Sequence, residues 1–454
     1  MLIIQPVDLS CGQLRDLAQQ HPTRYPVLFD SATEGGLGAW SMLAIASGDA
    51  LWLDRDHGLR QHGVPVPVER GFLATLQRWW LSCRESHAEP IPGPWRPGWA
   101  VWLGYELARE IEPSLRLPGS PLSCEAFALR TPAALIYEHV SGRCWAIGSA
   151  GSQGLLEQAR ADAATLASPA LVPASLLRAG SLHEAPPSAF LDAVTATQRA
   201  IAAGEVYQAN LSRQWQATLE NGVSGAAVYE RLRLANPAPF AAWAQFQGLQ
   251  ILSSSPERLL QLRGGEISTR PIAGTRPRSG SAARAASETS ALLAHAKERA
   301  EHVMLIDLER NDLGRVCVAG TVQVNEFMVV ESYAHVHHIV SNVRGRLRPE
   351  VSPVDALRAV FPGGTITGCP KVRCMSLIAS LEGEGRGAYT GSLGWLGTDG
   401  DADFNILIRT LTLQGNRCSF RAGAGIVADS VPLQELQETR AKARGLLHAL
   451  GGET

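Results

Sequence analysis

The chain has 454 residues, and its 41 lysine and arginine side chains nearly balance its 43 acidic ones, for a formal net charge of −2. This balance argues against a nucleic-acid-binding protein, which needs a surplus of basic residues to neutralise phosphates. With 45% hydrophobic and only 19% charged residues, the composition excludes a largely disordered chain.

The sequence carries no signal for a membrane or for export. No apolar run approaches the roughly 20 residues of a membrane-spanning helix, and the first residues lack the basic segment of a signal peptide. The eight cysteines are scattered without a CxxC pair, so neither a zinc site nor a disulfide framework is indicated. We therefore expect a cytoplasmic protein with reduced thiols.

Three regions follow one another along the chain. Residues 1–150 hold eight of the eleven tryptophans and short apolar runs broken by Gly, Pro and Ser, which is typical of strands in a mixed sheet. We interpret the tryptophans as core residues rather than as a ligand pocket. Residues 151–187 indicate a helix followed by a linker, and from 188 to 450 strands and helices alternate.

Two glycine-rich segments match nucleotide-binding loops but lack the required context. Gly423–Ala428 fits GxGxxA, yet the sequence continues as a strand and a helix is indicated only from Pro432. Gly363–Lys371 has the glycines of a phosphate loop without its Gly-Lys-Ser/Thr ending. The glycines are better suited to letting backbone amides approach a different anion, a carboxylate.

Several titratable residues of the C-terminal half have both a structural and a functional interpretation. Only three basic residues are lysines, all in this half, and lysine is not interchangeable with arginine. The spacing of Glu438 and Lys442 is that of a simple i,i+4 ion pair, but both could equally belong to a functional site. His337 and His338 fall in a strand-like run and so point to opposite faces. Glu257 follows an apolar strand. A carboxylate at the end of a strand is well placed to act as an acid or base, and the alternative interpretation is that Glu257 only forms part of a turn.

Taken in order and spacing, the motifs of the C-terminal half resemble those of the chorismate-utilising enzymes, the family of anthranilate, aminodeoxychorismate and isochorismate synthases. The resemblance covers residues 188–450 almost without a gap, whereas residues 1–150 resemble the family's N-terminal region only weakly. The motifs are Gly204–Gln208, Ser255–Glu257, Thr269–Thr275, Lys297–Val316, His338, Phe361–Met375, Arg409 and Gly423–Ser430. The resemblance implies an α+β fold, in which two large antiparallel sheets pack as a sandwich with helices outside and both halves form one unit.

The resemblance also implies roles for individual residues. Chorismate has two carboxylates and a poor leaving group, the C4 hydroxyl. Glu301 and Glu438 match the glutamates that hold Mg²⁺, a hard ion that prefers carboxylate ligands. Glu257 matches the general acid that protonates the C4 hydroxyl, and His338 the histidine beside the ring. The other positions that match substrate contacts are Gly274, Thr275, Thr365, Tyr389, Arg409, Gly423, Gly425 and Lys442, among which the arginine suits bidentate binding of the enolpyruvyl carboxylate.

Gln208 bears on the choice of nucleophile. Family members that add water have a lysine base at this position, and a glutamine cannot activate water as a lysine can, so the resemblance favours ammonia. No cysteine lies in a nucleophile-elbow setting, and ammonia is therefore expected from a separate glutamine amidotransferase subunit. A non-catalytic protein that only binds chorismate or a dinucleotide is the other hypothesis, and the retention of every acid and magnesium position counts against it.

Position 273 complicates the choice between the two ammonia-using members. The best-known aminodeoxychorismate synthases have a lysine there that attacks C2 before ammonia arrives at C4, but this chain has Ala273, as in anthranilate synthases, so no covalent adduct can form at that site. Phe361–Gly368 and Asp403–Arg409 instead resemble the aminodeoxychorismate branch, and Asp30 is interpreted as part of a core strand rather than as the remnant of a tryptophan pocket. We expect amination at C4, towards 4-aminobenzoate and folate, with amination at C2 to anthranilate as the alternative.

Overall fold

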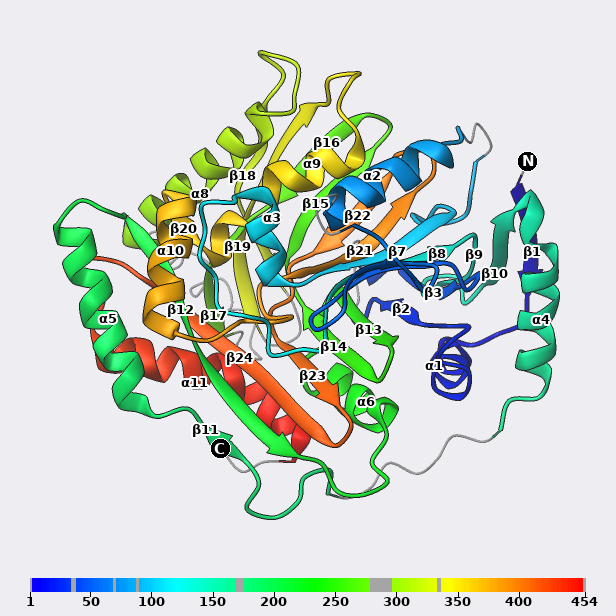
Figure 1. Ribbon diagram of the computed structural model, residues 1–454, viewed down its shortest axis with the longest axis horizontal. Coiled ribbons are helices and arrows are strands. Elements are labelled where there is room, and N and C mark those ends of the chain that lie inside the picture. The colour runs from blue at the N-terminus through cyan, green and yellow to red at the C-terminus, as the bar shows by residue number, and fades with distance from the viewer. Residues whose placement is uncertain are drawn as a thin grey trace.

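In the residues that the structure describes, two antiparallel sheets of twelve strands each form the centre of the protein (Figure 1). The computed structural model describes residues 2–33, 38–67, 71–86, 90–167, 175–277, 296–332 and 336–451, with the backbone alone for 273–277, 296–298, 332 and 336. The predicted α+β fold of two large antiparallel sheets with helices is confirmed.

The first sheet joins strands from both ends of the chain. In spatial order its strands are β1 (Leu2–Val7), β10 (Cys144–Ser149), β9 (Ala133–Glu138), β3 (Trp40–Ile45), β2 (Val27–Asp30), β13 (Phe240–Phe246), β14 (Leu249–Ser255), β23 (Thr410–Gln414), β24 (Arg417–Ile426), β12 (Gln208–Thr218) and β11 (His183–Glu184), and β20 (Gly368–Cys369) also pairs with β12.

The second sheet also joins strands from both halves of the chain. Its strands are β17 (Ile272–Pro277), β19 (Val336–Arg346), β16 (Glu266–Arg270), β15 (Arg258–Arg263), β22 (Ala402–Asn405), β21 (Ser392–Gly397), β7 (Gly98–Leu103), β8 (Cys124–Thr131), β4 (Ala50–Asp54), β5 (Gly58–Gln61) and β6 (Val64–Pro65), and β18 (Gln323–Ser332) also pairs with β19. Since β2 pairs with β13 and β7 with β21, the N-terminal strands do not form a sheet of their own.

Helices cover the outer faces of both sheets (Figure 1). Against the first sheet lie α1 (Cys11–Gln20), α4 (Gln153–Ala164), α5 (Pro187–Ala202), α6 (Gly225–Ala235), α10 (Lys371–Glu382) and α11 (Pro432–Leu450). Against the second lie α2 (Phe72–Ser82), α8 (Ala296–Gly314) and α9 (Pro353–Val360), while α3 (Ala108–Ile111) and the 3-10 turns η3 (Tyr105–Leu107), η4 (Ala150–Ser152) and η5 (Gly364–Ile366) lie in connections.

Strand β7 illustrates why the core has several layers. Its side chains alternate between two faces: Trp99, Val101 and Leu103 pack under α2 and α9, whereas Ala100 and Trp102 belong to the core between the sheets. A strand that is covered on both faces is apolar throughout. The prediction that N-terminal tryptophans are core residues is confirmed for five of the eight, at positions 52, 80, 95, 99 and 102.

Two further sequence predictions can be compared with the structure. All eight cysteines lie within the described residues and are free thiols. None of the helices in the described ranges is both long and apolar enough to cross a membrane.

Candidate active site

Strands β12 and β24 form the floor of the candidate site. They pair antiparallel, with Asn210 opposite Gly425. A Cβ atom at Gly425 would lie 2.4 Å from the Gln208 Nε2 atom, and one at Gly423 would lie 2.6 Å from the Tyr389 hydroxyl and 2.7 Å from the Asn210 Oδ1 atom. The two glycines therefore leave room for three polar side chains above the strand.

Two acceptor atoms on this floor lack partners. The Gln208 Oε1 and Asn210 Oδ1 atoms are buried, and neither accepts a hydrogen bond from any described residue. A buried polar atom left in that state costs about 1–3 kcal/mol. The floor therefore favours a ligand that brings hydrogen-bond donors.

A buried carboxyl group, that of Glu257, lies at the end of β14. It accepts a hydrogen bond from the Thr365 hydroxyl at 2.8 Å and from the Ile272 N–H at 3.5 Å. Burial raises its pKa to about 7, against the lowering effect of the Thr365 hydrogen bond, the Ile272 amide and the cations Lys442 and Arg409. The group can therefore still hold a proton near neutral pH, as a general acid must.

Arg409 is a partly buried cation near Glu257. It has a left-handed φ of 51°, unusual for a residue other than glycine. Its guanidinium donates to the Asn236 Oδ1 atom at 3.5 Å, and no carboxylate of the described residues lies within 4.0 Å. Burial lowers its pKa, while the nearby Glu257 raises it. A partly buried guanidinium that forms no ion pair with a described carboxylate is suited to binding a carboxylate from a ligand.

Lys442 connects helix α11 to the floor. Its Nζ atom donates to the Gly423 carbonyl oxygen at 3.0 Å and pairs with Glu438 at 2.8 Å. The i,i+4 pair predicted from the sequence is thus present. Both side chains are about half exposed. The second predicted metal ligand, Glu301, is partly exposed on α8.

The structure brings most of the predicted site residues into one group of contacts. Gln208, Tyr389, Gly423 and Gly425 meet on the floor, and Lys442, Glu257, Thr365 and Arg409 adjoin them. On the second sheet, Thr275 of β17 pairs with His338 of β19. Gly274 falls at the register shift between Ala273 and Thr275. His338 and His337 are both buried. The side chain of Thr275 lies outside the described ones.

Asn210 is a site residue that the sequence analysis did not single out. It lies two residues after Gln208 on β12, and residues i and i+2 of a strand share a face. This spacing of two residues on one strand is the sequence feature that could have identified Asn210. A second such residue is Asn236, whose amide oxygen contacts Arg409, and no local pattern marks it.

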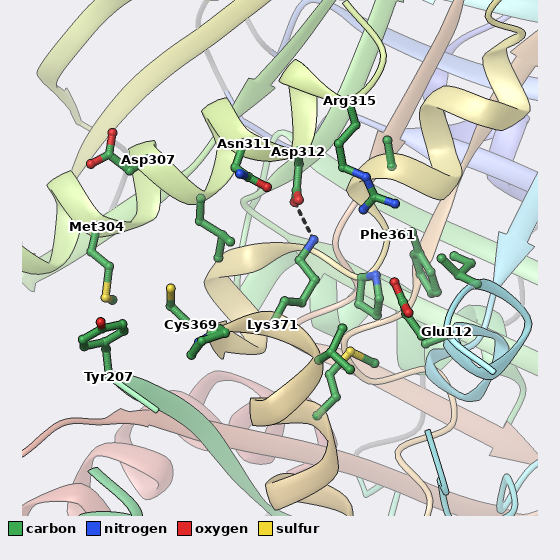
Figure 2. A pocket seen from close by; sticks show the side chains of 18 of the residues that line it. Glu112, Tyr207, Met304, Asp307, Asn311, Asp312, Arg315, Phe361, Cys369 and Lys371 are labelled. Carbon is green, nitrogen blue, oxygen red and sulfur yellow. Dashed lines mark hydrogen bonds and ion pairs between the residues drawn. The ribbon is translucent and has the colours of Figure 1, made fainter. Parts of the chain in front are cut away.

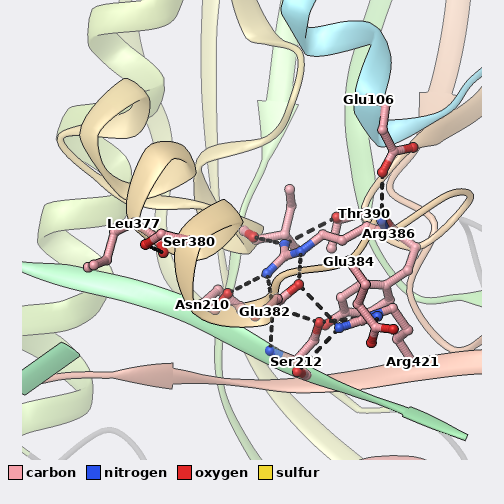
Figure 3. Close-up of polar contacts among 12 residues, drawn as sticks. Glu106, Asn210, Ser212, Leu377, Ser380, Glu382, Glu384, Arg386, Thr390 and Arg421 are labelled. Atoms are coloured by element: carbon pink, nitrogen blue, oxygen red, sulfur yellow. Dashed lines mark hydrogen bonds and ion pairs between the residues drawn. The ribbon is translucent and has the colours of Figure 1, made fainter. Parts of the chain in front are cut away.

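A buried charge network holds the floor in place (Figure 3). Glu382 accepts from Arg386 at 2.7 Å, from Arg421 at 3.2 Å and from the Ser212 N–H of β12 at 2.8 Å. Burial alone would raise the pKa of Glu382, but the two arginines hold it below its usual value. The Arg386 guanidinium also lies 5.5 Å from the ring centre of Tyr389 and so positions that side chain.

A cavity of about 740 Å³ is formed by other residues (Figure 2). Its wall includes Tyr207, Asp312 and Lys371, of which the last two form an ion pair. Of the predicted substrate, catalytic and metal residues, none lines it. We place the chemistry at Glu257 and Arg409 because the charges and unpartnered acceptors gather there, and not in this cavity.

One cluster of three potential metal ligands is found in the described part of the chain, formed by Cys11, Asp30 and His139. The Ser41 hydroxyl lies within it, 2.6 Å from Asp30 and 2.8 Å from His139. Asp30 is also paired with Arg233 at 3.1 Å. The carboxylate is therefore already neutralised inside the core, which agrees with the interpretation of Asp30 as a core residue.

Comparison with known proteins places the chain in a family. The model of the chorismate binding enzyme family matches residues 54–448. The chain is 41% identical over 369 residues to an anthranilate synthase component I-like protein of Synechocystis sp., covering 79% of this chain and 74% of that one. It is 37% identical over 460 residues to aminodeoxychorismate synthase component 1 of Bacillus subtilis, covering 98% and 95%.

A solved structure is also similar to this chain over most of its length. Anthranilate synthase component I from Streptococcus pneumoniae TIGR4 matches with a TM-score of 0.79 and 31% identity, over 91% of this chain and 93% of that one. The chain belongs to the chorismate binding enzyme family. It is a chorismate-utilising enzyme close to anthranilate synthase, and its relatives bear the names of two different synthases.

The floor predicts the effect of one added methyl group. In Gly425→Ala the new Cβ would meet Gln208 at 2.4 Å, so we expect KM for chorismate to rise about tenfold or more, a loss of about 1.4 kcal/mol. Gly154→Ala is the control, because nothing lies within 4 Å of its Cβ position. Steady-state kinetics measure both, and an unchanged KM in Gly425→Ala would contradict this account of the floor.

The charge network predicts a large loss of stability. In Glu382→Gln two buried arginines lose their shared carboxylate, so the free energy of unfolding should fall by about 3–5 kcal/mol. Glu384→Gln removes a half-exposed carboxylate that pairs with Arg421 at 2.7 Å and should cost less than about 1 kcal/mol. Urea unfolding curves measure both, and equal losses in the two variants would contradict the assigned role.

Proposed function

We propose that this protein aminates chorismate at C4, as the ammonia-using component of an aminodeoxychorismate synthase. The observation that carries the proposal is a buried acid, Glu257, near a partly buried arginine, Arg409, that forms no ion pair with a carboxylate of the described residues. Chorismate has one group that would interact with the acid and another that would interact with the arginine. Its C4 hydroxyl must be protonated to leave as water, and its enolpyruvyl group ends in a carboxylate.

The binding step follows from the charges. Arg409 would bind the enolpyruvyl carboxylate through two parallel N–H donors, and this anion would replace the partner that the arginine lacks. Lys442 lies at the same end of the floor, where it donates to the Gly423 carbonyl oxygen. The substrate would thus be held with its C4 hydroxyl towards Glu257.

The chemical step needs one proton at the leaving group. Glu257 would donate its proton to the C4 oxygen as the C4–O bond breaks, which produces water. The nitrogen lone pair of ammonia forms the new C–N bond, and the extra proton of the resulting ammonium returns to the Glu257 carboxylate. Atoms and charge balance, because chorismate and ammonia give 4-amino-4-deoxychorismate and water.

Ammonia as nucleophile is supported by the acceptors on the floor. The Gln208 Oε1 and Asn210 Oδ1 atoms are buried without donors among the described residues, and ammonia brings N–H donors. A glutamine is not a base that could take a proton from water. We propose that the ammonia comes from a glutamine amidotransferase subunit.

Mg²⁺ is the proposed cofactor, and Glu301 and Glu438 would hold it. Both offer hard carboxylate oxygens, and both are partly exposed, which suits an ion that keeps several of its waters. When bound, the ion would neutralise the ring carboxylate and polarise the ring.

The choice of C4 over C2 rests on two features. Phe361–Gly368 resembles the aminodeoxychorismate branch, and Asp30 forms an ion pair with Arg233 in the core. Ala273 and the relative from Synechocystis sp. favour anthranilate synthase component I, the alternative. With Ala273, amination at C4 would have to proceed without a covalent adduct at that position.

Product identity tests the proposal. Purified protein is given chorismate, Mg²⁺ and ammonium, followed by a 4-amino-4-deoxychorismate lyase, and the products are separated by chromatography. We expect 4-aminobenzoate that depends on the lyase. Anthranilate without 4-aminobenzoate would establish the alternative, and unconsumed chorismate would reject both.

The metal assignment predicts a specific defect. Glu438→Gln should weaken Mg²⁺ binding by at least the roughly tenfold that loss of an outer-shell partner costs, and turnover should be lost with the fold intact. Isothermal titration with Mg²⁺ and circular dichroism measure the two effects. Unchanged Mg²⁺ affinity would remove Glu438 from the metal site.

A further inference from the structure

Four polar side chains of the N-terminal region converge from separate elements. They are Cys11 at the start of α1, Asp30 at the end of β2, Ser41 in β3 and His139 directly after β9. The thiol sulfur, a carboxylate oxygen and an imidazole nitrogen of Cys11, Asp30 and His139 lie within 4.8 Å of one another. We call these four residues the Cys11 cluster. None of the residues of the candidate active site belongs to it.

The spacing of the donor atoms is close to that of a tetrahedral metal site. The Cys11 Sγ atom is 3.9 Å from the Asp30 Oδ1 atom and 3.7 Å from the Ser41 Oγ atom. With zinc about 2.3 Å from sulfur and about 2.1 Å from oxygen, tetrahedral geometry separates a sulfur ligand from an oxygen ligand by about 3.6 Å. The Ser41 Oγ atom is 2.6 Å from Asp30 and 2.8 Å from the His139 Nε2 atom, and these two contacts would lengthen by roughly 0.5–0.8 Å around an ion.

The two carboxylate oxygens of Asp30 have different partners. The Oδ2 atom pairs with Arg233 at 3.1 Å and accepts from the Tyr229 hydroxyl at 3.4 Å. The Oδ1 atom instead faces the Cys11 thiol and the Ser41 hydroxyl. A carboxylate that binds a metal ion is usually held by hydrogen bonds from residues around it. The pairing with Arg233 therefore orients Asp30 and leaves its Oδ1 atom directed into the cluster.

The charges around the cluster allow a divalent cation to enter. Arg15 donates to the Cys11 sulfur at 3.3 Å, and Arg15 and Arg233 both pair with Glu230, at 3.0 and 3.4 Å. The two arginines are thus offset by two carboxylates, those of Glu230 and Asp30. A divalent ion that displaces the proton of the thiol adds one positive charge to these four.

The protonation states of the donors agree with this geometry. Burial lowers the pKa of His139, so at neutral pH its imidazole is uncharged, the form that binds metal ions. Burial, then Asp30, raises the pKa of the Cys11 thiol, against the lowering effects of the neighbouring arginines and Ser41. The thiol therefore keeps its proton until a metal ion displaces it. Both side chains are partly exposed, which gives an ion access from solvent.

We propose that the Cys11 cluster binds a zinc ion through the Cys11 sulfur, the Asp30 Oδ1 atom and the His139 Nε2 atom, with the Ser41 hydroxyl oxygen as the fourth donor. Sulfur and imidazole ligands suit zinc, whereas magnesium takes oxygen ligands, so this site is separate from the proposed magnesium site. The ion would tie α1 to three strands of the first sheet. No CxxC pattern marks the site, because its donors come from separate elements.

Cobalt tests the thiolate contact directly. Reduced, metal-free, full-length protein is titrated with Co²⁺ while excess Mg²⁺ fills sites made of oxygen ligands. We expect a thiolate-to-cobalt charge-transfer band in the near ultraviolet that saturates at one ion per chain, and excess Zn²⁺ should abolish it. A wild-type protein without this band would overturn the inference.

Two variants and a matched control locate the ion. Cys11→Ser should lose the cobalt band, and His139→Gln should weaken Zn²⁺ binding, measured by competition with a chromophoric chelator, by at least the roughly 10–100-fold that loss of an outer-shell partner costs. Cys83→Ser removes a partly exposed thiol outside the cluster and should keep both properties. A band that persists in Cys11→Ser, or wild-type Zn²⁺ affinity in His139→Gln, rejects the site.

Folding and turnover are measured in parallel. Circular dichroism establishes that each variant is folded, and if one is not, the other decides. An ion that binds only the folded chain stabilises it, so Zn²⁺ should raise the melting temperature of the wild type and Cys83→Ser but not that of Cys11→Ser. The inference is independent of the proposed function, and turnover of chorismate with ammonium and Mg²⁺ should be the same in all three proteins.

Discussion

The pairing of β12 with β24 is the constraint on which the candidate site depends. It places Gln208 and Asn210 against two glycines and leaves their acceptor atoms uncovered. Other parts of the site are connected to this pair: α11 follows β24 and supplies Lys442, and the chain after η5 returns to β12 through β20. A side chain at Gly423 or Gly425 would displace Gln208, Asn210 or Tyr389, so the shape of the floor depends on both glycines.

The buried Glu382 extends this constraint to the N-terminal half of the chain. It joins Arg386 and Arg421 to β12, and the backbone N–H of Arg386 in turn donates to Glu106 of η3. Burial raises the pKa of Glu106 to about 7, against the lowering effect of the Gly387 and Arg386 amides. A short N-terminal turn therefore fixes the loop that carries Tyr389. The region that resembled the family least is part of the support for the site.

Much of the site could be predicted because its residues lie in ordered motifs whose chemistry is visible locally. The rejection of a dinucleotide loop at Gly423 is confirmed, since β24 continues to Ile426 and α11 begins at Pro432. Asn236 could not be predicted, because its contact with Arg409 joins residues 173 positions apart and no local pattern encodes that contact. The predicted metal ligands and the roles of individual site residues stay predictions.

The strand order has a consequence for how the chain is synthesised. β7 pairs with β21, and β2 with β13, so neighbours in the sheets are separated by up to nearly three hundred positions. Such distant partners slow folding, because a long loop must close before the contact forms. One edge of β2 therefore stays unpaired until the middle of the polypeptide has emerged, and one edge of β7 until the last third has, so the nascent chain exposes strand edges that can aggregate during this interval.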